Sequence, residues 1–155
     1  MVRDGYPSII LTADIALTEL AAALGECLGT PHVTLYHWCE DEGETWPDAD
    51  PMIIDVGSFD LAAPCIRASV VRHKAGDAKM HVDIDYDILD PPPLPAFAAR
   101  LAAKLEAPVI YDSGARSPFA YYRAWPDGRV DPVYVDPGEG AASSIRPDPH
   151  EGKAR

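Results

Sequence analysis

Residues 81–88 have the sequence His-Val-Asp-Ile-Asp-Tyr-Asp-Ile, in which polar and apolar side chains alternate with a period of two. Successive side chains of an extended strand point to opposite faces of a sheet. The apolar residues therefore share one face, and the other face carries His81, Asp83, Asp85 and Asp87. This alternation is typical of an antiparallel sheet with one face on the core and one face in solvent. The segment thus predicts a sheet-based fold with an acidic row on one strand.

The preceding segment, residues 65–73, alternates in the same way, with apolar side chains at Ile66, Ala68 and Val70. The link between the two segments contains Gly and Asp, which favour turns. We therefore expect residues 65–73 and 81–88 to pair as an antiparallel hairpin. Short apolar or β-branched runs predict further strands at residues 8–12, 32–38, 52–56 and 109–111, and a second hairpin joins 119–125 to 129–135 through Pro126-Asp127-Gly128.

Two segments carry apolar residues at helical spacing. The first segment has leucines on one stripe, namely Leu17, Leu20, Leu24 and Leu28. Asp14 is placed to cap the start of this helix, and Gly29 is placed to end it. The stripe of the second segment consists of Leu94, Phe97, Leu101 and Leu105. Pro95 suits the first turn of this helix, where an N–H group is not needed.

The expected fold is a two-layer α+β domain over residues 1–135, with two amphipathic helices on one face of a mainly antiparallel sheet. Pro132 cannot donate to a sheet ladder, so the last strand is expected at a sheet edge. Residues 136–155 are dominated by Gly, Pro, Ser and charged residues. This composition predicts a flexible C-terminal tail.

The charge of the chain limits its partners. The 155 residues include 25 acidic and 13 basic side chains, which give a formal net charge of -12. Nucleic acids and anionic membranes are recognised through Lys and Arg, so neither is an expected ligand. A basic protein partner, a bound cation or simple solubility fits this charge better.

The compartment is indicated by two other features. The three cysteines have no metal-like spacing, and no targeting segment is visible at the N-terminus. Both features predict a location in the reducing cytoplasm.

An acidic segment, residues 39–50, holds six carboxylates, no Lys or Arg, and the aromatic residue Trp46. Residues 33–90 contain 13 acidic and 4 basic side chains, a net charge of -9, so the negative charge is concentrated there. An aromatic side chain among charged residues is a common composition for a binding surface. The residues expected to bind a protein partner are Glu40, Asp41, Glu42, Glu44, Trp46, Asp83, Asp85 and Asp87.

Two other interpretations of the aspartates remain open. In the first, the protein is an enzyme that depends on a divalent metal, because such cations bind several oxygen ligands. Asp83 and Asp85 would then hold the ion, and His81 or Asp55 would complete its shell. In the second, the domain is structural, without a discrete site, and the aspartates are a solvated strand face that pairs with Arg67 or Arg72. The protein-binding interpretation requires neither cofactor nor catalysis.

The general makeup of residues 1–135, a small, acidic, single domain, resembles the immunity proteins of bacterial polymorphic toxin systems. The resemblance implies a non-enzymatic protein that binds a basic toxin domain and blocks its active site. It covers composition and size rather than a motif. It therefore assigns no role to any individual residue.

Overall fold

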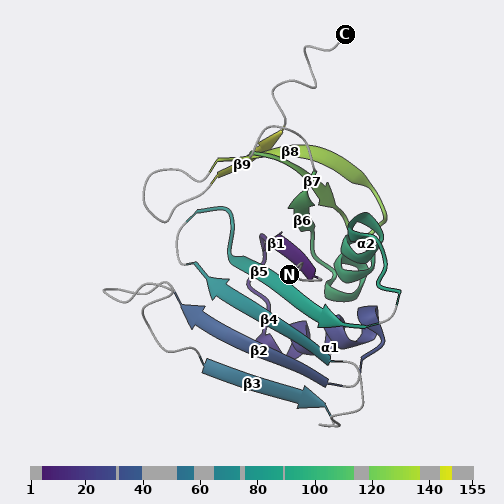
Figure 1. Cartoon of the computed structure of the whole chain (residues 1–155). Coiled ribbons are helices and arrows are strands. Elements are labelled where there is room, and N and C mark those ends of the chain that lie inside the picture. The colour runs from purple at the N-terminus through teal and green to yellow at the C-terminus, as the bar shows by residue number, and fades with distance from the viewer. Residues whose placement is uncertain are drawn as a thin grey trace.

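One mixed sheet and two helices make up the described part of the computed structural model, which covers residues 5–30, 32–39, 52–57, 65–73, 76–88, 90–113, 119–136 and 144–147 (Figure 1). The strands are β1 (Gly5–Leu11), β2 (His32–Cys39), β3 (Met52–Gly57), β4 (Cys65–Arg72), β5 (Met80–Asp87), β6 (Val109–Asp112), β7 (Ala120–Ala124), β8 (Val130–Asp136) and β9 (Ser144–Pro147). Their order in the sheet is β3-β2-β4-β5-β1-β6-β7-β8-β9. Strands β2 and β4 are parallel, and the other neighbours are antiparallel. The expected α+β class and mainly antiparallel sheet are confirmed.

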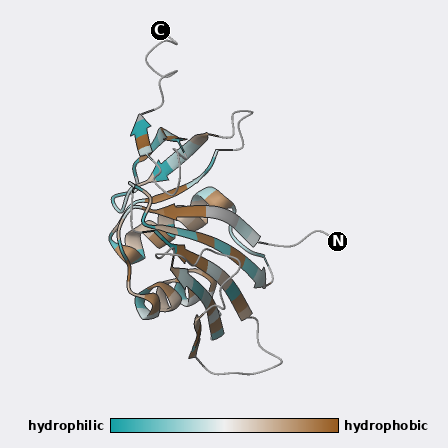
Figure 2. Ribbon diagram, turned by 90° about the vertical axis from the view of Figure 1, so that its left-hand side faces the viewer, coloured by the Kyte–Doolittle hydropathy of each residue, from teal (hydrophilic) through white to brown (hydrophobic). Residues whose placement is uncertain are grey.

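Strands β4 and β5 form the hairpin that their alternation predicts. Ala68 pairs with Ile84 and Val70 pairs with Val82, and all four side chains are buried. The intervening residues of β5 lie on the opposite face, where Asp83 is exposed. Figure 2 shows the resulting change between hydrophobic and hydrophilic colours along the strands. Alternation with period two thus separates a core face from an outer face in this part of the sheet.

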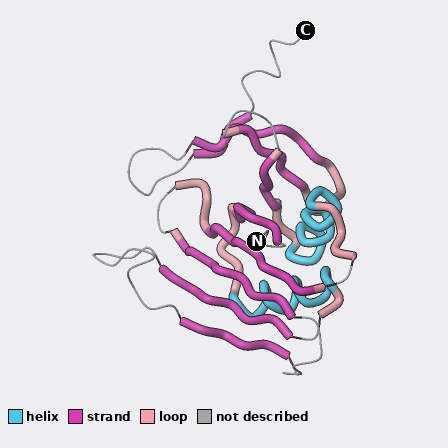
Figure 3. The backbone as a smooth tube through the Cα atoms, viewed as in Figure 1, coloured by secondary structure: helices cyan, strands magenta, loops and turns pink. Residues whose placement is uncertain are grey.

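The two helices are α1 (Leu17–Leu28) and α2 (Leu94–Leu105), which lie next to each other (Figure 3). The predicted stripes are correct at the central positions, because Leu20, Leu24 and Leu101 are fully buried. Helix α1 contacts β2 and β3, whereas α2 contacts β6 and β7. Neither helix is long and apolar enough to cross a membrane, as far as the described residues show. The two-layer packing, with both helices on one face of the sheet, stays a prediction.

The ends of α1 differ in how well the sequence predicts them. Gly29 ends the helix with a φ of 67°, as expected from its tolerance of the left-handed conformation. The prediction for Asp14 is wrong, because the residue preceding the helix is Ala16 and no side chain caps the helix. Asp14 instead forms an ion pair with Arg72, with 3.2 Å between Oδ1 and Nε. The guanidinium also donates to the carbonyl of Ile15, at 2.9 Å, so the residues before α1 are held by a long-range partner on β4.

The second predicted hairpin, β7 with β8, is confirmed. Gly128 in its turn has a φ of 95°, a conformation that residues with a Cβ rarely adopt. Arg123 donates to both carboxylate oxygens of Asp131, at 3.2 and 2.7 Å, and the indole of Trp125 donates to one of them at 2.7 Å. Hydrogen bonds from Arg123, and then from Trp125, hold the pKa of Asp131 below its ordinary value.

The apolar residues form two cores on opposite faces of the sheet. Ile9 and Leu11 belong to the main core, which includes the buried helix residues. Ile10 lies between them in sequence and therefore faces the other side, where it joins a second cluster. This second core consists of Ile10, Ala78, Ile110, Val133 and Val135, with Tyr121 and Ile145 packed against it. A sheet buried on both faces at its centre was not foreseen, since the alternation in residues 81–88 indicates only one buried face.

Part of the segment assigned to a flexible tail belongs to the sheet. Strand β9 pairs with β8, and Ile145 lies opposite Val135. The amide of Ile145 donates to the Asp77 carboxylate at 2.9 Å. Strand β8 is therefore an inner strand and not the edge that Pro132 suggested. Pro132 is tolerated because the pairing with β9 begins only at Val133, one residue later.

Candidate functional site

Strands β3, β2, β4 and β5 carry one continuous polar surface on the face opposite to the main core, here called the outer face. Their registers place Asp55, Thr34, Arg67 and Asp85 in one line across the four strands. A second line runs parallel to the first and consists of Ile53, Tyr36, Ser69 and Asp83. Because side chains in register on neighbouring strands are in contact range, the outer face is a compact array of residues far apart in sequence.

The acidic row of β5, which comprises Asp83, Asp85 and Asp87, forms one side of this array. Asp83 is exposed and lies opposite Ser69 of β4, and Asp85 is half-buried and lies opposite Arg67. Asp87 lies opposite Cys65 in the register, and its side chain is outside the described residues. The structure thus places Asp83 and Asp85 on the face that the alternation predicts. The other expected cation, Arg72, pairs with Asp14 and not with the row.

Asp55 lies at the far side of the outer face and has local partners. Its carboxylate accepts a hydrogen bond of 2.6 Å from the Thr34 hydroxyl, and His32 Nε2 is 3.3 Å from the same oxygen. Thr34 and His32 are both buried, whereas Asp55 is exposed. A carboxylate that accepts from the buried Thr34 hydroxyl and lies beside the buried His32 ring gives these polar groups a partner. The geometry therefore gives Asp55 a local structural role in joining β3 to β2.

The four residues suggested as metal ligands are not brought together. Asp55 and Asp85 are separated by three steps between strands, which amounts to about 14 Å at the usual strand spacing. Calcium and magnesium require ligand oxygens within about 2.6 Å of the ion, so these two carboxylates cannot share one. His81 uses its Nδ1 atom in a contact of 2.6 Å with His73 Nε2. Across the described ranges, no group of three or more His, Cys, Asp or Glu side chains could hold a metal ion.

The pair His73 and His81 lies at the end of the β4–β5 hairpin and was not foreseen from the sequence. The rings meet edge to face, with 4.7 Å between their centroids. One nitrogen must donate and the other must accept, so at least one ring is neutral while this contact exists. His81 lies opposite Val71, which makes His73 its diagonal neighbour. The hairpin register, once known, would have been the signal for this pair.

Five of the candidate binding residues lie outside the described residues, namely Glu40, Asp41, Glu42, Glu44 and Trp46. The described ends of this stretch are nevertheless informative. Strand β2 ends at Cys39 and β3 begins at Met52, and His37 pairs with Met52. Cys39 and Met52 therefore lie at the same end of the β2–β3 pair. That end also carries Trp38, which lies in line with Val71 and His81 on the outer face.

Five basic side chains elsewhere in the described structure are held by carboxylates. The ion pairs away from the outer face are Asp14–Arg72, Glu26–Lys104, Asp127–Arg129, Asp131–Arg123 and Asp136–Arg146. The described side chains on the outer face include three carboxylates, Asp55, Asp83 and Asp85, and the single guanidinium of Arg67. The described side chains of the outer face thus carry more negative than positive charge.

No family model matches the chain, and neither a curated protein nor a solved structure matches it. Function is therefore inferred from the geometry and the charge of the described residues.

Proposed function

We propose that this protein is a non-enzymatic, cytoplasmic binding module that recognises a basic protein through its outer face and the neighbouring acidic segment. The proposal includes the two-layer arrangement, in which both helices cover the core face and leave the outer face accessible. An immunity protein that neutralises a basic toxin domain in a bacterium is the specific form of this function that the small, acidic makeup favours. The observation that carries the proposal is that Asp55, Asp83 and Asp85 share one sheet face, whose described side chains include a single guanidinium, that of Arg67.

The outer face combines charge with side chains that can bury apolar surface. Asp83 is exposed, and the same line of residues contains the half-buried Tyr36 and the exposed Ile53. Trp38 lies one line further along β2 and is also half-buried. Productive interfaces commonly surround aromatic or apolar anchors with polar and charged residues. A partner with Lys and Arg around an apolar patch would complement this surface.

Electrostatic attraction would act mainly on the encounter with such a partner. Opposite charges on two surfaces accelerate association and disfavour like-charged competitors. The effect weakens as salt increases, because the Debye length is about 10 Å at 0.1 M ionic strength and shorter at higher salt. The proposed function therefore predicts binding that is selective for basic proteins and sensitive to salt.

Charge reversal on the outer face tests this function. The partner is first captured from native cytosol with the purified chain and identified by mass spectrometry, and its affinity is then measured by calorimetry. The double variant Asp83→Lys and Asp85→Lys should weaken binding at least about tenfold, since opposed like charges at an interface cost several kcal/mol. Glu40→Lys with Glu42→Lys tests the acidic segment in the same way.

A matched control makes an equal change of charge on α1 and directly after α2. Glu19 and Glu106 are both exposed, and reversing them to Lys alters the net charge by the same amount as the outer-face variant. This control should change the affinity by less than about threefold, because distant charges are screened. Unchanged binding by the outer-face variant, or equal losses in both double variants, would contradict the assignment of the interface.

A further inference from the structure

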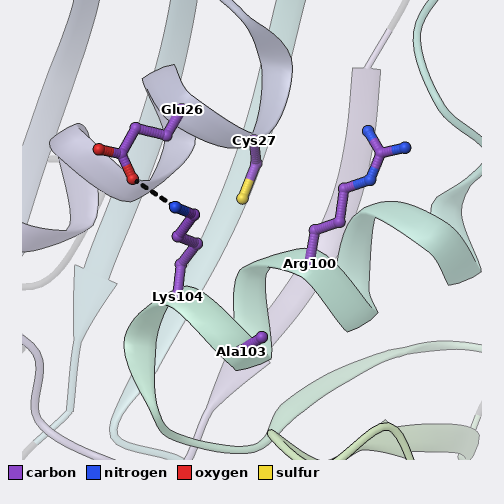
Figure 4. A pocket seen from close by; sticks show the side chains of 5 residues that line it. All are labelled: Glu26, Cys27, Arg100, Ala103 and Lys104. Carbon is purple, nitrogen blue, oxygen red and sulfur yellow. Dashed lines mark ion pairs between the residues drawn. The ribbon is translucent and has the colours of Figure 1, made fainter.

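A pocket between the two helices is independent of the outer face. It has a volume of about 570 Å³ and is lined by Glu26 and Cys27 of α1 and by Arg100, Ala103 and Lys104 of α2 (Figure 4). Small-molecule sites commonly have volumes of a few hundred Å³. The pocket is thus large enough for a small organic ligand.

The rim of the pocket is positively charged. Lys104 and Arg100 rise from successive turns of α2 on either side of the Cys27 thiol (Figure 4). Lys104 Nζ is 3.1 Å from Glu26 Oε2, and both side chains are more than half exposed. Among the residues that the structure describes, no carboxylate forms an ion pair with Arg100. The rim therefore holds two cations and one carboxylate in a chain whose net charge is -12.

The floor of the pocket is neutral. Cys27 is 7% exposed, and burial raises the pKa of its thiol although Lys104 and Arg100 act in the opposite direction. A protonated, buried cysteine behaves as a small apolar side chain rather than as a nucleophile. Ala103 adds a methyl group to the lining. A ligand in this pocket would thus meet an apolar floor and a cationic rim.

We propose that the pocket binds a small organic monoanion, a carboxylate attached to a short apolar tail. The guanidinium of Arg100 offers a planar pair of N–H donors, which match the two oxygens of a carboxylate. The tail packs against Cys27, Ala103 and the methylene groups of Lys104. One negative charge is preferred over two, because Glu26 already neutralises Lys104.

Titrations with hexanoate, acetate and hexylamine at constant ionic strength test this site, with backbone amide shifts in NMR as the readout. Hexanoate should give saturable shifts around Cys27 and Ala103. Acetate, which lacks the tail, should bind at least about tenfold more weakly, since each buried CH₂ contributes roughly 0.8 kcal/mol. Hexylamine has the same tail and the opposite charge, and it should give no saturable shifts.

Three variants distinguish a built site from general attraction of anions. Arg100→Gln should weaken hexanoate binding at least about tenfold, because hydrogen bonds to charged groups are among the stronger ones. Glu26→Gln should strengthen hexanoate binding several-fold by releasing Lys104. Arg67→Gln, which removes one positive charge from the outer face, should leave hexanoate binding unchanged.

Thermal unfolding of each variant shows whether folding is intact, and exposed substitutions are expected to alter it little. Absence of saturable hexanoate binding would overturn the proposal. Equal binding of hexylamine, or equal binding by Arg100→Gln and the unaltered chain, would also overturn it.

Discussion

His37 lies on the core side of β2, where only 5% of its surface is exposed. Burial lowers the pKa of its imidazole, the Arg72 guanidinium lowers it further, and the Asp14 carboxylate acts in the opposite direction. The neutral ring is therefore favoured in the folded state. Asp14 and Arg72 were each expected in other roles, and their ion pair instead contributes to the environment of a buried histidine.

The depressed pKa of His37 has a predictable effect on stability. The unfolded chain takes up a proton below about pH 6.5, the ordinary histidine value, while the folded chain resists it. The stability that the neutral His37 ring contributes is present above about pH 6.5 and is lost as the pH falls through the folded-state pKa. His37→Gln should therefore show a smaller loss of unfolding free energy between about pH 7.5 and about pH 5.5. Urea denaturation at both pH values measures the unfolding free energy of the unaltered chain and of His37→Gln. The same pH dependence in both chains would contradict the prediction.

At the scale of elements, strand β9 shows how contacts to its neighbouring strand and to distant residues together stabilise a short segment. Its four residues contain one large apolar side chain, Ile145, which packs against the second core. Antiparallel pairing with β8 and the hydrogen bond to Asp77 supply its other contacts. β8 directly precedes β9 in the chain, whereas Asp77 and Ile10 are far away in sequence, and local composition alone suggested a tail.

Removal of β9 should therefore cost more than removal of the residues beyond it. A chain that ends at residue 143 loses the partner of β8 and uncovers part of the second core. Its unfolding free energy should fall by about 1–2 kcal/mol, comparable to exposing part of a buried Ile side chain. A chain that ends at residue 147 keeps these contacts and is the matched control. Equal stability of the two chains in urea denaturation would mean that β9 contributes nothing.

At the scale of the whole molecule, the net charge of -12 opposes folding. Self-repulsion destabilises a compact chain of one predominant charge, and salt screens it. Salt also weakens the exposed ion pairs, but each of these pairs contributes little to the unfolding free energy. The midpoint of thermal unfolding should therefore rise by a few degrees as NaCl increases from about 50 mM to about 500 mM, a range over which the Debye length falls severalfold.

The double variant Glu19→Lys and Glu106→Lys makes the net charge four units less negative. Its midpoint of thermal unfolding should therefore rise less with NaCl. Calorimetric scans at each salt concentration provide the measurement. A midpoint that falls with salt would show that attractive ion pairs outweigh the repulsion.

Local patterns determined the parts of this protein whose partners are close in sequence. The β4–β5 hairpin, the β7–β8 turn at Gly128 and the buried stripes of the two helices follow from periodicity and turn chemistry. Leu20 and Leu24 belong to the stripe of α1, and Leu101 belongs to that of α2. The face of Asp83 and Asp85 follows for the same reason, because a period of two separates the faces of a strand.

Only the tertiary structure decided which strands are neighbours, because a strand's alternation defines its faces and not its partners. The parallel pairing of β2 with β4 placed Thr34 beside Arg67 and separated Asp55 from Asp85 by two intervening strands. Folding of the sheet likewise gave Ile10 and Ile145 a second core. The acidic outer face could thus be predicted strand by strand, whereas its arrangement across the strands depended on long-range pairing.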